Sequence, residues 1–66
     1  MKLGDVVMFT AADCAYATWF LGQVGVISNI TNSHCQVKWI QPVPYIGGRT
    51  TTISSFETNK FTSYAE

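Results

Sequence analysis

The chain has 66 residues, and its four Lys or Arg side chains balance four Asp or Glu side chains, so the formal net charge is zero. A chain of this length makes one domain, residues 1–66. The cations Lys2, Lys38, Arg49 and Lys60 are scattered along it. This argues against tight binding of nucleic acid, which needs a cation for each neutralised phosphate.

Apolar residues make up 47% of the chain, aromatic residues 14% and charged residues 12%. So small a domain cannot bury that much apolar surface, which favours a binding face or an oligomer interface. No stretch approaches the roughly 20 apolar residues of a membrane span, and Lys2 and Gly4 interrupt the region where a signal peptide begins. We therefore expect a cytoplasmic protein, not in a membrane, with Cys14 and Cys35 as free thiols.

The first predicted strand covers residues 5–10, which are rich in β-branched and aromatic side chains and place Val7 and Phe9 on one face. Residues 11–18 break this pattern. They are small, mixed and rich in alanine, and they are too few to define a helix, so we expect a long loop there.

A hairpin is predicted next, from a strand over residues 19–30, a polar turn at 31–33 and a strand over 34–41. The apolar positions of the first of these strands do not keep a period of two. A bulge or bend near Gly25 would explain the slip. The other strand alternates regularly, and its apolar positions are Cys35, Val37 and Trp39.

Pro42 and Pro44 exclude a regular central strand after this hairpin, because proline cannot donate a ladder hydrogen bond. Residues 45–48 are expected to form a turn in which the paired glycines take positive φ. Residues 49–53 are rich in threonine and are predicted to form a fourth strand.

Residues 54–57 have the capping-box spacing, a serine followed three positions later by a glutamate, which indicates one helical or 3-10 turn. A last short strand is predicted over residues 60–64. Together these elements predict an all-β fold of five short strands, a closed or partly closed barrel with one 3-10 turn before the last strand. The expected core residues are Val7, Ile27, Val37, Trp39 and Phe61.

Two sets of motifs carry a resemblance. Gly4-Asp5-x-Val7 and Gly25-x-Ile27-x-x-Ile30 resemble KOW and Tudor-like modules of the SH3-like barrel class. A second set is similar to small uncharacterised proteins of tailed bacteriophages, including marine cyanophages: Val37-Lys38-Trp39, Tyr45, Gly48 and Ser54-x-Phe56-Glu57. The resemblance implies a five-stranded SH3-like barrel and a phage origin, hence the host cytoplasm. KOW relatives bind RNA or protein surfaces, but this chain lacks their basic loops.

The candidates for catalysis or metal binding are His34 with Cys35 and Asp13 with Cys14. Structural zinc sites typically use paired C-x-x-C spacing, which is absent, so no metal or other cofactor is predicted. Neighbouring strand residues point to opposite faces, so His34 cannot activate Cys35. The carboxylates are too few and too dispersed for acid–base catalysis. We therefore expect no enzyme.

The aromatic side chains are the better functional signal. Tyr16, Trp19 and Phe20 end the first long loop, and Tyr45 follows the proline segment, so these rings can line one surface. Exposed rings recognise proline-rich peptides, quaternary ammonium groups or bases. The alternative is that two or three of the rings complete a small core.

The sequence thus predicts a binding or assembly module without enzymatic activity, which binds a protein or a second copy of itself through this aromatic face. The alternative is a KOW-like accessory module associated with nucleic acid. A local cluster of the four cations would favour that alternative.

Overall fold

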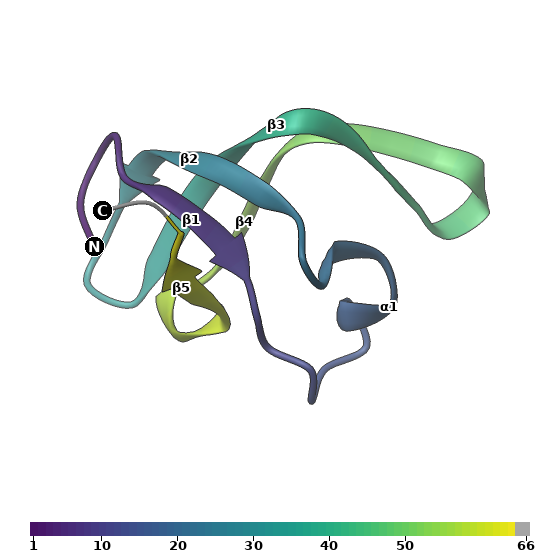
Figure 1. Ribbon diagram of the computed structural model, residues 1–66, viewed down its shortest axis with the longest axis horizontal. Helices are drawn as coiled ribbons and strands as arrows, with labels where there is room; N and C mark the ends of the chain where they lie inside the picture. The colour runs from purple at the N-terminus through teal and green to yellow at the C-terminus, as the bar shows by residue number, and fades with distance from the viewer. Residues whose placement is uncertain (65–66) are drawn as a thin grey trace.

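The computed structural model describes residues 1–64, and these form one five-stranded antiparallel sheet in the order β4-β3-β2-β1-β5 (Figure 1). The all-β fold is therefore confirmed. The strands and helical turns are β1 Val6–Phe9, α1 Ala17–Phe20, β2 Val24–Ile30, β3 His34–Tyr45, η1 Ile46–Gly48, β4 Arg49–Glu57, η2 Thr58–Lys60 and β5 Phe61–Ser63.

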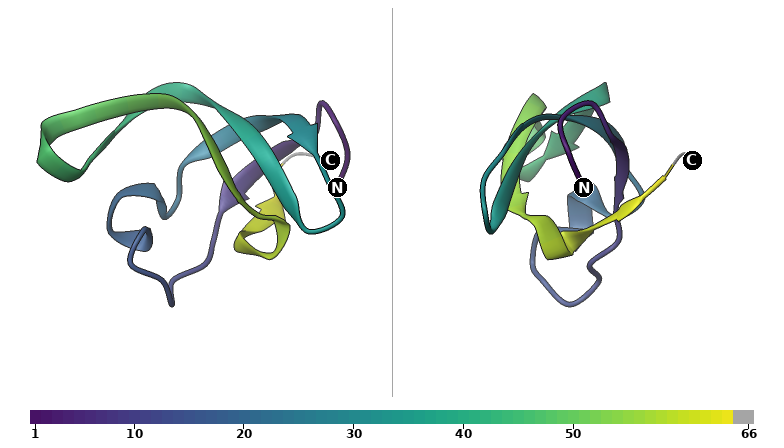
Figure 2. Two further views of the ribbon diagram at one scale, coloured as in Figure 1. Left: turned by 180° about the vertical axis from the view of Figure 1, so that it is seen from behind. Right: turned by 90° about the vertical axis from the view of Figure 1, so that its left-hand side faces the viewer.

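The sheet curls around its own inner face, as the end-on view in Figure 2 shows. Alternate residues of each strand point inward, and these make the core because an apolar side chain loses contact with water there. All five predicted core residues are buried. Within residues 1–64, the buried hydrophobic residues are Val7, Phe9, Phe20, Ile27, Cys35, Val37, Trp39, Val43 and Phe61.

The predicted strand over residues 19–30 is wrong in its first part. Residues Ala17–Phe20 form the single helical turn α1, in which the Phe20 amide donates to the Tyr16 carbonyl at 2.9 Å. Gly22, with φ of 84°, then reverses the chain into β2. α1 is four residues long. Within residues 1–64, no helix has the length and apolarity needed to cross a bilayer.

Gly25 does not bend β2 as expected, because the register shift between β2 and β3 lies between Ile27 and Asn29. Gly25 is instead needed for close approach. A Cβ at this position would overlap the side chain of Val37 and lie 2.9 Å from the Lys38 carbonyl oxygen. The missing side chain therefore lets β2 and β3 pack directly over the core.

β3 continues past its predicted end and passes through both prolines to Tyr45. Pro42 and Pro44 do not end the strand, although they were expected to exclude a regular strand here. The β3–β4 register shifts between Lys38 and Val43, a stretch that contains Pro42, and Pro44 then pairs opposite Thr50. This far end of β3 pairs only with β4, so a missing amide hydrogen on its other side costs nothing. The turn at 45–48 is confirmed, with positive φ at both glycines.

β4 is longer than predicted, because residues 54–57 continue it as strand instead of forming a helical turn. The local capping-box signal loses to pairing with β3, in which Ser54 lies opposite Val37 and Phe56 opposite Cys35. The predicted 3-10 turn before the last strand is present, but it is η2, at Thr58–Lys60. Its first amide donates to the Ser33 carbonyl at 3.0 Å.

The sheet does not close into a barrel. Among residues 1–64, β5 pairs only with β1, and β4 pairs only with β3, so these two strands are the open edges. β5 has only three residues, fewer than the predicted strand over 60–64. The rings of Phe56 and Phe61 lie 6.0 Å apart between the two edges. Side-chain packing thus joins the edges where backbone pairing does not.

Candidate functional site

Phe20 is the centre of an aromatic cluster on the inner face of the sheet. The turn of α1 directs its ring into the curl of the sheet, where it stacks on Trp39 with ring centroids 5.4 Å apart and an interplanar angle of 25°. Four further rings surround it, at 6.1 Å for Phe9, 6.3 Å for Tyr16, 6.4 Å for Tyr45 and 5.2 Å for Phe56. Offset and edge-on contacts of this kind stabilise each ring pair beyond the area they bury.

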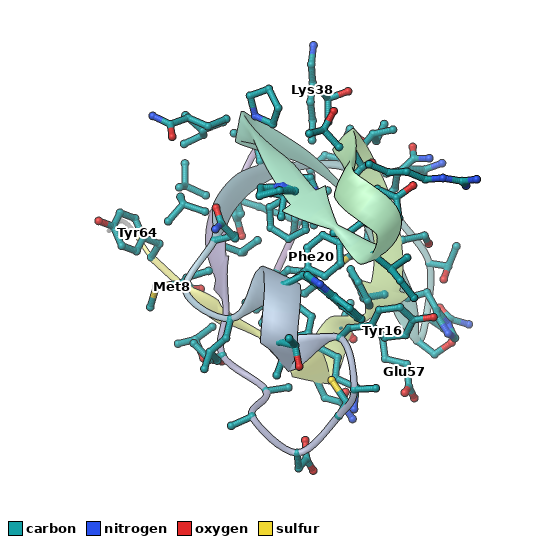
Figure 3. The ribbon with its side chains drawn as sticks, turned by 90° about the vertical axis from the view of Figure 1, so that its right-hand side faces the viewer. Met8, Tyr16, Phe20, Lys38, Glu57 and Tyr64 are labelled. Atoms are coloured by element: carbon teal, nitrogen blue, oxygen red, sulfur yellow. The ribbon has the colours of Figure 1, made fainter. Side chains whose placement is uncertain are left out.

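A groove of about 360 Å³ opens over this cluster. We call it the aromatic groove. α1 and the residue before it supply one side, and the end of β3 together with β4 supplies the other. Its lining residues are Tyr16, Phe20, Tyr45, Thr51, Ile53, Ser54, Ser55 and Phe56. Figure 3 shows Tyr16 beside Phe20, in keeping with the distance between their rings.

The rings of the groove differ in exposure. Phe20 is only 3% exposed and forms the floor, whereas Tyr16 is 54% exposed and stands at the mouth. Tyr45 and Phe56 are half-buried between them. A groove with a rigid buried floor and an exposed ring at its edge presents apolar surface that need not reorganise on binding.

Three of the four residues expected to line an aromatic surface, Tyr16, Phe20 and Tyr45, come together in this groove. Trp19 does not line it; its side chain is half-buried and packs against the core. The sequence interpretation missed Ser54, Ser55 and Phe56, because the capping-box spacing of residues 54–57 predicts a helical turn there. The alternation of Ser54 and Phe56 on one face is the strand signal that would have found them.

Charged side chains flank the aromatic groove and do not line it. Arg49 lies opposite Tyr45 in the β3–β4 pairing, and Glu57 follows Phe56. Within the groove, the Trp39 indole N–H donates to Ser54 Oγ at 3.1 Å, and the Thr51 hydroxyl donates to the Ile53 carbonyl at 2.7 Å. The groove therefore offers rings and hydroxyl groups to a ligand, with one cation and one anion outside it.

The other candidate residues lie elsewhere. His34 is exposed and its Nδ1 is 2.8 Å from Ser33 Oγ, whereas the neighbouring Cys35 is buried on the inner face. Burial raises the pKa of the Cys35 thiol above its usual value, since a thiolate loses its hydration there. Cys14 and Cys35 are both free thiols. In the part of the chain that the structure describes, no three His, Cys, Asp or Glu side chains are grouped to hold a metal ion.

No protein family model matches this chain, and neither a curated protein nor a solved structure shows significant similarity to it. The functional argument therefore rests on the groove and on the faces of the sheet.

Proposed function

We propose that this protein is a binding or assembly module without enzymatic activity, and that it holds a segment of a protein partner in the aromatic groove. The observation that supports this most is the combination of the exposed Tyr16 with the half-buried Tyr45 and Phe56 over the buried Phe20. Aromatic side chains with rigid surroundings are typical anchors of protein interfaces.

The chemistry of the lining favours a polypeptide over a phosphate backbone. None of the groove residues is a lysine, an arginine or a histidine. Neutralising each phosphate would need such a cation, whereas rings and hydroxyl groups suit apolar side chains and peptide groups. Arg49 and Glu57 flank the groove with opposite charges, which can orient a segment carrying complementary charges.

We further propose that the curled sheet is an SH3-like barrel that is open between β4 and β5. The strand order and the 3-10 turn η2 before β5 support this assignment. With the resemblance to phage proteins given above, we propose a phage-encoded module that acts in the cytoplasm of the host.

The experiment compares two tyrosines of similar exposure. Tyr16, in the groove, is 54% exposed, and Tyr64, outside it, is 59% exposed. Peptides selected on the wild-type protein from a random displayed library should lose at least about tenfold in affinity for Tyr16→Ser, the loss of one interface anchor. They should bind Tyr64→Ser as they bind the wild type.

Thermal melting shows whether each variant is folded, and isotope-edited NMR shifts show where the peptide binds. Shifts at Phe20, Tyr45 and Phe56 are expected. A library that yields no binder, or binders that tolerate Tyr16→Ser but not Tyr64→Ser, would refute the groove as the site. A folded Tyr45→Ser variant is expected to weaken the same peptides.

A further inference from the structure

The open edge of β4 borders the aromatic groove. Among residues 1–64, β4 pairs only with β3, and five of its residues line the groove: Thr51, Ile53, Ser54, Ser55 and Phe56. An edge strand exposes the backbone amides and carbonyls that face away from its neighbour. An extended polypeptide carries the matching amides and carbonyls, so an open edge selects a strand of another chain as its ligand.

Hydrogen bonds on the other side of the sheet determine which β4 groups face the open edge. The Ile27 amide donates to the Asp5 carbonyl at 3.0 Å, and the Gly4 amide donates to the Ile27 carbonyl at 2.9 Å. Both backbone groups of Ile27 therefore point away from β3. Opposite residues of an antiparallel ladder either exchange both hydrogen bonds or exchange none. Val37, opposite Ile27, thus directs its amide and carbonyl to β4, where it pairs with Ser54.

The residues on either side of Ser54 point the other way. Because the direction alternates along a strand, the amide and carbonyl of Ile53 and of Ser55 face the open edge. Within residues 1–64, the two Ser55 groups have no hydrogen-bond partner. The Ile53 groups share one side-chain atom, since the Thr51 hydroxyl donates to the Ile53 carbonyl at 2.7 Å and accepts from the Ile53 amide at 3.3 Å. The Thr51 hydroxyl thus takes the place of one backbone pair of a neighbouring strand.

β4 lacks the features that usually protect an edge strand from pairing. Natural edge strands are short, or they carry lysine, proline or inward-pointing charges. β5, the other open edge, has three residues, whereas β4 has nine and contains neither lysine nor proline. Its charged residues are the first and the last, Arg49 and Glu57. The stretch between them is therefore suited to pairing with a further strand.

We propose that the partner segment binds as an added β-strand on the open edge of β4, an inference that rests on the proposed function. The segment exchanges backbone hydrogen bonds with Ser55 and with Ile53. These two residues are about 7 Å apart along β4, the distance between alternate residues of any extended strand. At Ile53 the segment displaces the Thr51 hydroxyl.

This geometry also specifies the side chains of the segment. Ser54 lies on the inner side, where its Oγ accepts from the indole N–H of the buried Trp39. The segment residue opposite Ser54 points to the same side and so into the aromatic groove. A large apolar side chain is expected there, because Tyr16 and Phe20 line that groove. The two residues flanking it lie beside the exposed Ile53 and Ser55 and point to the outer side.

The first test leaves the protein unchanged and methylates the backbone nitrogens of the selected peptides one at a time. N-methylation removes a backbone donor but keeps the side chain. An added strand should lose at least about tenfold in affinity at two positions, the residues opposite Ser55 and Ile53. Methylation of the residue between them, whose amide faces away from β4, should change the affinity by less than about threefold. The Ser55 amide should exchange rapidly with solvent in the free protein and slowly in the complex.

Ser55→Pro tests the edge from the side of the protein. Proline removes the outward amide but no hydrogen bond to β3, and edge strands tolerate it. The peptides should lose at least about tenfold in affinity. Ser63→Pro in β5 is the matched control. Because the Tyr64 amide donates to the Val6 carbonyl of β1, the Ser63 amide faces the other open edge, and this variant should bind like the wild type.

Thr51→Val tests the hydroxyl that occupies the edge at Ile53. Without this competitor the added strand should bind about threefold more tightly. Thr52→Val is the control, since Thr52 is exposed and does not line the groove, and it should leave the affinity unchanged. An unchanged or weaker affinity of Thr51→Val would overturn the role given to the Thr51 hydroxyl. Thermal melting shows whether each variant is folded, and the N-methylated peptides need no variant at all.

The outcomes distinguish strand addition from the proposed function. Peptides that bind Tyr16→Ser weakly but show no alternating effect of N-methylation would overturn strand addition and leave the groove as the site. Equal binding by the wild type and a folded Ser55→Pro variant would do the same. Peptides indifferent to Tyr16→Ser would refute the groove itself. A Ser55 amide already protected in the free protein, together with a dimer in sedimentation, would mean that a second copy of the chain covers the edge, and would overturn the proposal.

Discussion

The inner and outer faces of one sheet use the same strands in different ways. Inward, Val7, Phe9 and Val37 have no exposed surface, and Phe20 from α1 seals the curl from the side. Outward, the neighbours Val6 and Met8 are only half-buried, and Ile40 and Tyr64 are mostly exposed. Both faces are apolar in sequence, yet one forms a packed core and the other stays partly exposed to water.

The difference shows that burial depends on what covers a face as well as on its composition. The inner face is covered because the sheet curls and because a single helical turn adds one ring to it. On the outer face, Ile40 and Tyr64 keep most of their surface exposed to water. We expect substitutions on the inner face to change the free energy of unfolding more than substitutions on the outer face.

The sharpest test of this contrast uses two adjacent residues of β3. Trp39→Ala removes the ring that stacks on Phe20 and leaves a cavity in the core. It should lower the free energy of unfolding by about 3–5 kcal/mol. That is much of the stability of a domain this small. Ile40→Ala, at the next position but on the outer face, should change it by less than about 0.5 kcal/mol. Urea melts at low protein concentration measure both values. Equal effects would mean that the two faces do not differ as described.

Gly25 tests the closeness of β2 and β3 on the inner side. Gly25→Ala should cost about 1–3 kcal/mol, since the new methyl group overlaps the Val37 side chain. Gly47→Ala is the matched control, because it has open space around it and only its φ of 73° is unfavourable, at a cost of about 1 kcal/mol. Thermal melts should rank Gly25→Ala as the more destabilising change. The reverse order would show that close approach at Gly25 is relaxed at little cost.

The two thiols, Cys14 and Cys35, test how far solvent reaches the inner face of the sheet. Burial raises the pKa of the Cys35 thiol in the folded state, so the folded protein favours the protonated thiol. The stability that the buried neutral thiol contributes is therefore complete below the usual thiol pKa. It is lost as the pH rises through the raised folded-state value. Cys35→Ala should remove this alkaline loss, which urea midpoints at neutral and alkaline pH would show. In the native wild type, a thiol reagent should modify the half-buried Cys14 well before Cys35; equal rates would show that the inner face opens readily.

The smallest effect is expected from the charges. Lys38 has the apolar neighbours Val26 and Ile53, and the other cations lie on different segments of the chain. Single-stranded RNA and duplex DNA should therefore bind no more tightly than about 10⁻⁶ to 10⁻⁴ M at physiological salt. Fluorescence anisotropy titrations measure this. Nanomolar binding with a steep salt dependence would favour a KOW-like nucleic-acid module over the protein-binding one.

Strand alternation and turn chemistry made part of this molecule predictable from its sequence. The inward register of Val7, Val37 and Trp39 follows from a period of two, and the glycine turn after Tyr45 follows from positive φ. Both are local properties, since each depends on a few consecutive residues. They were sufficient for the fold class, for the five expected core residues and for three of the aromatic residues of the groove.

The tertiary structure decided what local signals left open or gave wrongly. Residues 54–57 carry a helix-capping pattern, yet pairing with β3 keeps them in a strand, and this brings Phe56 into the groove. Phe20 became core because α1 turns it onto Trp39, a residue far away in the sequence. The sequence by itself determined which residues are apolar and how they alternate. Only long-range packing decided which of those faces is closed over and which stays open, because burial requires a second surface that no local pattern specifies.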